Sequence, residues 1–386
     1  MQAFPEKSKI RPNMAIFKRK DFATIGLMTS DHLSQYTQCE RQKTNIYADA
    51  DAACRYVADA ITDLIRSRNE AGRPTVLGLA TGSTPVRLYR ELIRRHREEG
   101  LSFARVITFN LDEYYGLAGD HPESYRRFMQ EQLFDHVDLE PGNTHVPDGL
   151  SPREQVFDAC AAYEEAIREA GGLDIQILGI GRTGHIGFNE PGSGPDTLTR
   201  LVTLDSLTRQ DAARDFLGEE NVPRHAITMG VGTILKAKKV FLLAWGEAKA
   251  EVIARSVEAE PSESIPASFL QQHEDCEFCI DQDAAARLTR ICRPWLVGPV
   301  EWSPGMIRKS VVWLAGKVDK PLLKLTEEDY SQNGMADLLT EKSSAYQLNI
   351  ELFNVTQHTI TGWPGGKPKT DDSSRPERAD PFPKRS

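Results

Sequence analysis

The sequence predicts an α/β fold in which a mainly parallel sheet carries helices on both of its faces. Apolar runs typical of strands alternate with segments of helical periodicity throughout residues 50–300. Several of these runs lead into turns rich in glycine or acidic residues. The chain has 386 residues, 40% of them hydrophobic, which permits one large core with appendages. Ligands of such sheets bind beyond the carboxyl ends of the strands, where these turns lie.

The first elements follow one another directly. Residues 49–72 place apolar side chains at helical spacing and stop at a glycine, which predicts an amphipathic helix. Residues 75–85 form an apolar run that turns at Gly82, and Pro85 suits the first turn of the helix that follows. Further strands are predicted within 103–117, 173–188 and 238–245, and a further helix ends within 254–260.

The composition changes after Pro299. Two modest helices are expected within 301–316 and 320–339, followed by a short, partly alternating apolar run at 348–355. Pro, Gly and charged residues dominate the last 25 residues, which cannot bury a core. The predicted organisation is an N-terminal extension over 1–43, an α/β domain over 44–298, a helical extension over 299–361, and a linker or disordered tail over 362–386.

Charge and cysteine content exclude several classes of protein. The formal net charge of -9 provides no general attraction to nucleic acid or to an anionic membrane. An anionic ligand must therefore be bound by groups within its own site. The basic cluster Lys18-Arg19-Lys20 is expected to be a solvated arm. Six cysteines with no secretory segment ahead of them favour a reducing compartment, with cytoplasm as the expected location. The lone pair Cys276 and Cys279 lacks the further ligands of a zinc site, so no metal is predicted.

The turn containing Gly82, Ser83 and Thr84 is the first candidate site. It lies between a strand and a helix, where free backbone N–H groups and the helix dipole attract an anion and the two hydroxyl groups add donors. A phosphate fits this position, although the turn lacks the lysine of a nucleotide P-loop. The alternative is an ordinary tight turn with a capping serine.

Asp112 and Glu113 follow a hydrophobic strand, where catalytic side chains of α/β sheets gather. One of the two carboxylates could be a general base, and the alternative is a helix cap. Successive residues of a strand face opposite ways, so the two are not expected to share a task. His121, Ser124 and Tyr125 come next and are expected to help shape the pocket.

A third motif, GxGxxG over 179–184, follows a strand but is not followed by a helix, because residues 185–195 contain too much Gly and Pro. A dinucleotide site is therefore not expected. The segment is instead a loop that carries His185 and Glu190, a pair in which the carboxylate could orient a histidine that exchanges protons near neutral pH. The alternative is a histidine that satisfies loop backbone groups.

Taken together, these segments resemble the glucosamine-6-phosphate deaminase family over about residues 45–298. The motifs GLATGSTP, FN-x-DEYYGL, GIGRTGHIGFNEP, HAITMGVGTIL and WGEAKA occur in the family's order at comparable spacing. The resemblance implies a three-layer Rossmann-like fold, shared with sugar-phosphate isomerases and phosphogluconolactonases. It also implies conversion of glucosamine 6-phosphate and water to fructose 6-phosphate and ammonia, without a cofactor.

The same resemblance implies roles for individual residues. The phosphate would be held by Gly82, Ser83, Thr84, Arg214 and Lys249, with Arg209 as a competitor for the arginine position. Asp112 would move a proton between carbons 2 and 1 of the open-chain sugar. His185, supported by Glu190, would assist ring opening.

The sequence departs from the family pattern at two positions. Thr183 stands two residues before the histidine, where relatives commonly carry an aspartate, and a hydroxyl cannot stabilise imidazolium as a carboxylate does. Val202 stands where allosteric members carry a lysine, which leaves Arg200 alone. A phosphosugar-binding protein with weak or no catalysis, or another sugar-phosphate isomerase or lactonase, is therefore kept as an alternative.

The extra length is most similar to the amino-terminal part of long family members, in which a TGWPGGKP-type segment leads into a deacetylase-like domain. The expected small-molecule partner is a phosphorylated amino sugar. Self-association and a deacetylase-like domain or partner are further expectations, whereas nucleic acid and membrane are not expected partners.

Overall fold

The computed structural model describes residues 39–342 and 344–361, with side chains to residue 355. It divides into two compact units, one ending at Cys292 and the other starting at Arg293, slightly before the boundary expected from the sequence. The basic cluster and most of the N-terminal extension lie outside the described residues, as does the expected tail over 362–386.

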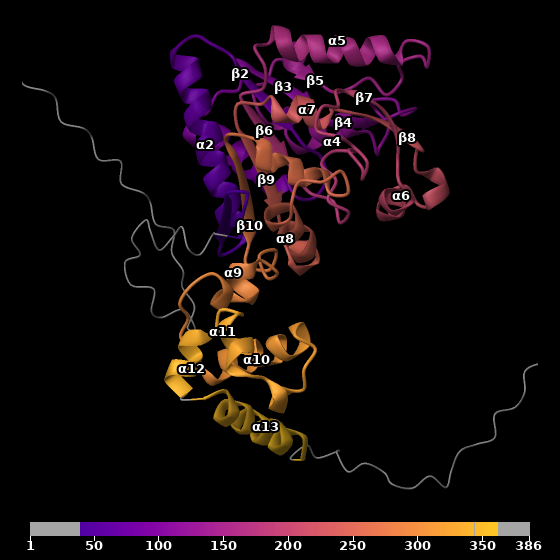
Figure 1. The fold of residues 1–386 in the computed structure, drawn as a ribbon. Helices are drawn as coiled ribbons and strands as arrows, with labels where there is room; N and C mark the ends of the chain where they lie inside the picture. Colours follow the sequence, from indigo (N-terminus) through magenta and orange to yellow (C-terminus); the bar gives the residue numbers. More distant parts are fainter. Residues whose placement is uncertain (1–38, 343, 362–386) are drawn as a thin grey trace, which may run out of the picture. The chain divides into compact units, whose positions relative to one another are not determined.

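The first unit is built on a seven-stranded sheet in which every pairing is parallel (Figure 1). In spatial order its strands are β1 (Thr44–Tyr47), β10 (Cys276–Asp281), β9 (Val240–Ala244), β6 (Ile175–Leu178), β2 (Thr75–Leu79), β3 (Val106–Asn110) and β5 (Thr144–His145). The parallel sheet expected from the sequence is thus confirmed.

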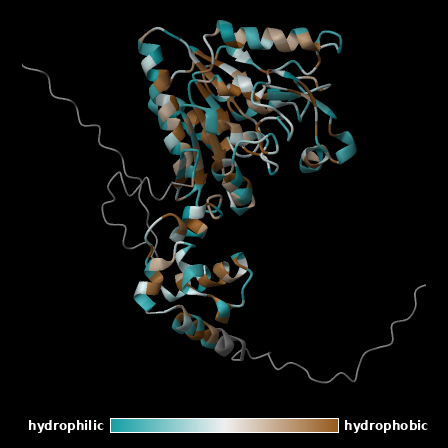
Figure 2. Ribbon diagram, viewed as in Figure 1, coloured by the Kyte–Doolittle hydropathy of each residue, from teal (hydrophilic) through white to brown (hydrophobic). Residues whose placement is uncertain are grey.

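Helices cover both faces of this sheet, which makes three layers. One apolar cluster joins the sheet to α2 (Ala50–Glu70), α3 (Val86–Glu99) and α4 (Tyr125–Gln132). A second joins the opposite face to α5 (Val156–Glu169), α7 (Val231–Leu235) and α8 (Ala250–Glu258). Figure 2 shows the hydrophobic colouring concentrated on the central strands. Cys276 and Cys279 belong to different clusters, because residues three apart in a strand face opposite ways.

A small antiparallel sheet, which the sequence did not indicate, lies in the same unit. It pairs β8 (His225–Thr228) with β4 (Asp112–Tyr114) on one side and β7 (Arg200–Thr203) on the other. The short helix α6 (Ser206–Ala212) follows β7, and α9 (Thr289–Cys292) ends the unit. Short 3-10 turns complete it at Phe134–His136, Pro141–Asn143, Glu219–Asn221, Glu247–Lys249 and Pro266–Gln272.

The second unit is helical, with α10 (Pro304–Lys317), α11 (Glu327–Ser331), α12 (Ala336–Lys342), α13 (Ala345–Thr361) and 3-10 turns at Pro294–Leu296 and Leu322–Lys324. The single helix expected within 320–339 is wrong. Gly334 adopts a positive φ of 75°, which separates α11 from α12. The apolar run at 348–355 lies inside α13. Among the described residues, no helix combines the length and the apolar character needed to cross a membrane.

Candidate functional site

The turn after β2 leaves open space next to Gly82. Gly82 has a φ of +89°, a conformation that favours glycine, and a methyl group placed on it would find no atom within 4 Å. Gly82 and Ser83 are exposed, and Thr84 is half-buried just before α3. The turn therefore presents its backbone and hydroxyl groups to an open space at the N-terminus of a 14-residue helix.

Lys249 lies in the 3-10 turn after β9 and reaches the loop after β6. Its Nζ donates a hydrogen bond to the carbonyl oxygen of Ile180 at 2.7 Å. The neighbouring Gly179 approaches Thr84, since a methyl group on it would lie 3.9 Å from the threonine Cβ. Burial lowers the pKa of Lys249, and the positive charge of Arg182 lowers it further, although Asp211 opposes this.

The two arginines that compete for the phosphate differ in environment. Arg214 is exposed, whereas Arg209 is half-buried and pairs with Glu219 through an Nη2–Oε1 distance of 3.3 Å. In the described part of the chain, no hydrogen bond or ion pair joins either guanidinium to the turn at residues 82–84. The structure thus groups Lys249 with this turn and does not decide between the two arginines.

The adjacent carboxylates Asp112 and Glu113 have separate surroundings, as expected for neighbours in a strand. The carboxylate of Glu113 accepts hydrogen bonds from the backbone N–H groups of Tyr125 and Arg126 and from the hydroxyl of Ser124. Ser124 is the N-cap of α4, and its hydroxyl also accepts a hydrogen bond from the N–H group of Arg126. Glu113 is therefore committed to the start of that helix.

Asp112 is 4% exposed and lies opposite Thr228 in the antiparallel sheet. Burial raises the pKa of Asp112 to about 8, and the adjacent charge of Glu113 adds to the effect. Gly187 approaches the carboxylate closely, because a methyl group on it would lie 3.1 Å from Oδ2. A buried carboxyl group whose pKa is moved towards neutrality is suited to exchange protons at physiological pH.

His185 is held through one edge of its imidazole ring. Its Nδ1 lies 2.9 Å from the hydroxyl of Thr183 and 3.4 Å from Oε2 of Glu190. Burial alone would raise the pKa of Glu190, but hydrogen bonds with His185 and Thr208 bring it below the ordinary value. The ring also rests against Gly181, where a methyl group would lie 2.1 Å from Cε1 and Nε2. This arrangement fixes the ring through Nδ1 and keeps Nε2 for another partner.

Two contributors to the surroundings of His185 were missed in the sequence. Thr208 of α6 donates to Glu190, and Gly181 leaves room for the imidazole. Tyr125, which the sequence indicated as a residue of the pocket, hydrogen-bonds through its hydroxyl with Thr81 and Tyr114 and so links the turn after β2 to the strand that carries Asp112. The GxG motif could have indicated that Gly181 makes room for a side chain, because His185 follows only four residues later. No sequence signal marks Thr208.

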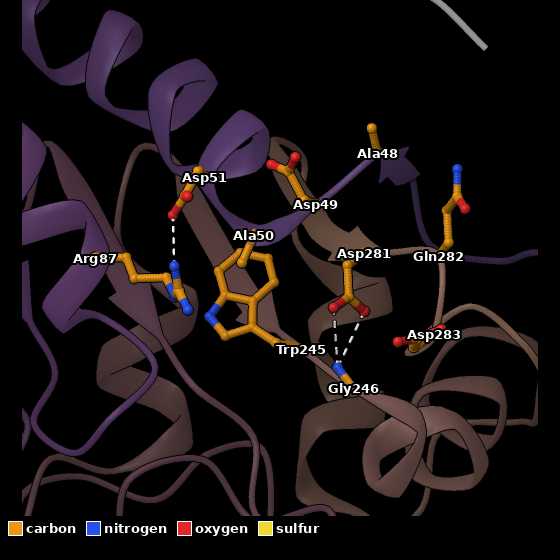
Figure 3. A pocket seen from close by; sticks show the side chains of 10 residues that line it. All are labelled: Ala48, Asp49, Ala50, Asp51, Arg87, Trp245, Gly246, Asp281, Gln282 and Asp283. Carbon is orange, nitrogen blue, oxygen red and sulfur yellow. Dashed lines mark hydrogen bonds and ion pairs between the residues drawn. The ribbon is translucent and has the colours of Figure 1, made fainter. Parts of the chain in front are cut away.

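A separate surface pocket of about 540 Å³ lies beyond the ends of β1, β9 and β10 (Figure 3). Its acidic side chains are Asp49, Asp51, Asp281 and Asp283. Arg87 is paired with Asp51, and Asp281 accepts hydrogen bonds from the backbone of Gly246. This lining repels a phosphate, so the pocket is not a candidate for the anion site.

Comparison with known proteins decides the family. Residues 48–278 match the family described as glucosamine-6-phosphate isomerases/6-phosphogluconolactonase. The chain belongs to this family. A glucosamine-6-phosphate deaminase-like protein of Bacteroides thetaiotaomicron is 50% identical over 352 residues, or 91% of this chain and 53% of the relative. The chain thus spans about half the length of that relative.

Two further members are named as glucosamine-6-phosphate deaminases. That of Shewanella woodyi is 53% identical over 233 residues, which cover 60% of this chain and 88% of the relative. The solved structure of a monomeric glucosamine-6-phosphate deaminase matches with a TM-score of 0.61 at 41% identity, covering 64% of this chain and all of that one. The family resemblance and the Rossmann-like α/β fold expected from the sequence are confirmed.

Proposed function

We propose that this protein is a glucosamine-6-phosphate deaminase, which converts glucosamine 6-phosphate and water to fructose 6-phosphate and ammonia. The single observation that carries the proposal is Asp112, a buried carboxyl group with a raised pKa whose neighbour Glu113 is committed to α4. Aldose–ketose isomerisation needs one base that reaches two adjacent carbons, and Asp112 provides one such group. Two relatives named as deaminases, which are 53% and 41% identical to this chain over the matched residues, support the proposal.

In the proposed reaction, the turn at Gly82, Ser83 and Thr84 binds the phosphate together with Lys249 and an arginine, Arg214 by resemblance. His185 donates a proton from Nε2 to the ring oxygen as the sugar opens, while Glu190 and Thr183 orient the ring through Nδ1. The hydroxyl of Thr183 thus lies beside the imidazole, at the position where relatives commonly carry an aspartate.

Asp112 then removes the proton from carbon 2 of the open-chain aldehyde. The electron pair forms the double bond between carbons 1 and 2, and the carbonyl oxygen takes a proton from solvent, which gives an enolamine with a hydroxyl group on carbon 1. The carboxyl group of Asp112 exchanges its proton with solvent and then donates a proton to carbon 1, which leaves an imine at carbon 2. Water adds to that carbon and ammonia leaves, which yields the ketone. The carboxylate is thus regenerated within one turnover, and the balance needs no redox partner.

The direct test supplies purified protein with glucosamine 6-phosphate in D₂O and follows both ammonia and deuterium. We expect ammonia release, with deuterium from solvent at carbon 1 of the product. A lactonase would hydrolyse 6-phosphogluconolactone without carbon-bound exchange. Thermal stabilisation by sugar phosphates without turnover of any of them would instead indicate a binding protein, and would contradict the proposal.

The raised pKa of Asp112 predicts a pH profile. Because only the ionised carboxylate can act as a base, kcat/KM should rise about tenfold per pH unit below pH 8 and level off above it. Glu113→Gln removes the adjacent charge and should move the rise to lower pH. Initial rates from pH 5.5 to 9.5 check both, with corrections for titration of the substrate. A flat profile over this range would show that Asp112 is not the base.

We also propose a cytoplasmic location for this activity. Cys54, Cys160, Cys276 and Cys279 are buried free thiols, which suits a reducing compartment. Fractionation of cells that produce the protein would check the location.

A further inference from the structure

Arg182 is a cationic side chain of the loop that binds Lys249 through the carbonyl group of Ile180. It lies in the loop after β6, between Gly181 and Thr183, two residues from the carbonyl group that binds Lys249. Its Nη2 pairs with Oδ1 of Asp211 at 3.0 Å, and the two side chains are 49% and 50% exposed. An ion pair this exposed contributes little to the stability of the fold, so we consider a role in ligand binding.

The partners of Lys249 make this position unusual. Its half-buried ammonium donates to a backbone carbonyl, and no carboxylate of the described residues lies within ion-pair distance of it. The charges of Asp211 and Arg182 act on it with opposite signs, and the effect of Asp211 is the larger of the two. Lys249 is bound to this loop through the carbonyl group of Ile180, and Arg182 follows two residues further along the same loop. A bound anion would offset the repulsion between the two cations. In a protein of net charge -9, such an arrangement indicates an anion site.

We propose that Arg182 is a further cationic ligand of the substrate phosphate, in addition to Lys249 and Arg214, and that Asp211 holds it in the absence of substrate. The inference rests on the proposed function in that it takes the anion to be the phosphate of the sugar. A guanidinium can bind two phosphate oxygens in a fork, which a lysine cannot. The phosphate therefore replaces Asp211 as the partner of Arg182 when substrate enters.

This exchange links phosphate binding to α6. Asp211 belongs to the helix whose Thr208 donates to Glu190, and Glu190 in turn contacts His185. Release of Asp211 detaches the end of α6 from the loop that carries the histidine. Arg182 is thus a binding residue, and Asp211 is a competitor for it rather than a ligand.

Two substitutions with opposite expected effects test the proposal. Arg182→Gln should raise KM for glucosamine 6-phosphate about tenfold, the loss typical of one charge-assisted contact, with kcat nearly unchanged. Asp211→Asn should lower KM, because the competing carboxylate is gone. A merely structural ion pair predicts the same direction for both variants, and that result would overturn the proposal.

Inorganic phosphate provides a readout that does not depend on turnover. We expect phosphate to raise the melting temperature of the wild type, to raise it less for Arg182→Gln and more for Asp211→Asn at the same concentration. The matched control is Arg127→Gln, which breaks another exposed pair, with Glu131 at 2.8 Å, on α4. It should respond to phosphate as the wild type does.

The outcomes separate this inference from the proposed function. If no ammonia is released but the two variants shift phosphate binding in opposite directions, the anion site stands and the deaminase proposal fails. If ammonia is released and Arg182→Gln binds phosphate as the wild type does, Arg182 is not a ligand. Should Arg182→Gln fail to fold, Asp211→Asn decides alone, since an unchanged or weaker response to phosphate contradicts the competition.

Discussion

Asp112→Asn is expected to abolish ammonia release while the protein stays folded. Asparagine has nearly the same shape as aspartate but cannot accept the carbon-bound proton, so turnover should fall by at least about 100- to 10,000-fold, the usual contribution of a general base. Exchange of deuterium into carbon 1 should fall in parallel. Single-turnover assays would check the loss, and ammonia release at the wild-type rate would refute the assignment of the base.

The same substitution should stabilise the protein, with a dependence on pH that is specific to this carboxyl group. The pKa of Asp112 is raised on folding, so the folded protein keeps a proton that the unfolded chain loses between about pH 4 and pH 8. The wild type therefore loses stability as pH rises through this range, at about 1.4 kcal/mol per unit of pKa difference. The asparagine side chain of the variant does not titrate, so the variant lacks this loss.

Thermal unfolding at several pH values checks this. Asp112→Asn and the wild type should have similar stability near pH 4, and the variant should be the more stable near pH 8. Ser83→Ala serves as the control, because it removes a hydroxyl from the exposed turn without changing a buried charge. A variant that is less stable than the wild type at pH 8 would mean that the carboxylate supports the fold.

Gly181→Ala is expected to disable the site through the position of His185. The backbone of Gly181 does not have a positive φ, so alanine is compatible with it, but the added methyl group would lie 2.1 Å from Cε1 and Nε2. The ring must turn away and lose its contacts with Thr183 and Glu190. A misplacement of about 1 Å can cost about 100-fold in rate, so kcat should fall by at least that factor.

Gly142→Ala is the matched control for this variant. Gly142 also lacks a positive φ, and a methyl group placed on it would meet no atom within 4 Å. Both variants should melt close to the wild type, and only Gly181→Ala should lose activity. Equal kcat values for the two would show that the imidazole does not need the position seen here.

Much of the layered fold could be predicted because its elements carry strong local signals. The run at 75–79 is apolar throughout and leads into a glycine turn and a proline before a helix, and the structure contains this order as β2, the turn and α3. The antiparallel sheet could not be predicted. Its strands have three or four residues, and β4 starts after a single residue that follows β3. Alternation over so few positions does not indicate a separate sheet.

The adjacent carboxylates show a similar limit at the level of the site. Local rules allow either Asp112 or Glu113 to cap a helix or to act as a base. The choice depends on where α4 begins in space, since its first N–H groups meet Glu113. The neighbours of the imidazole were predicted in part, because Thr183 and Glu190 belong to the same loop as His185. Thr208 arrives from another element and has no signal of its own.

The pairing of β1 with β10 has a consequence for how the chain is made. Strand β1 leaves the ribosome among the first parts of the unit, yet its hydrogen-bonded neighbour begins at Cys276. At typical rates of synthesis, the interval between the two is on the order of ten seconds or more. During that time β1 lacks its neighbour, and β9, once it has been made, is an open edge until β10 follows. Chaperone binding to stalled nascent chains should therefore decrease once residues up to Asp281 have emerged.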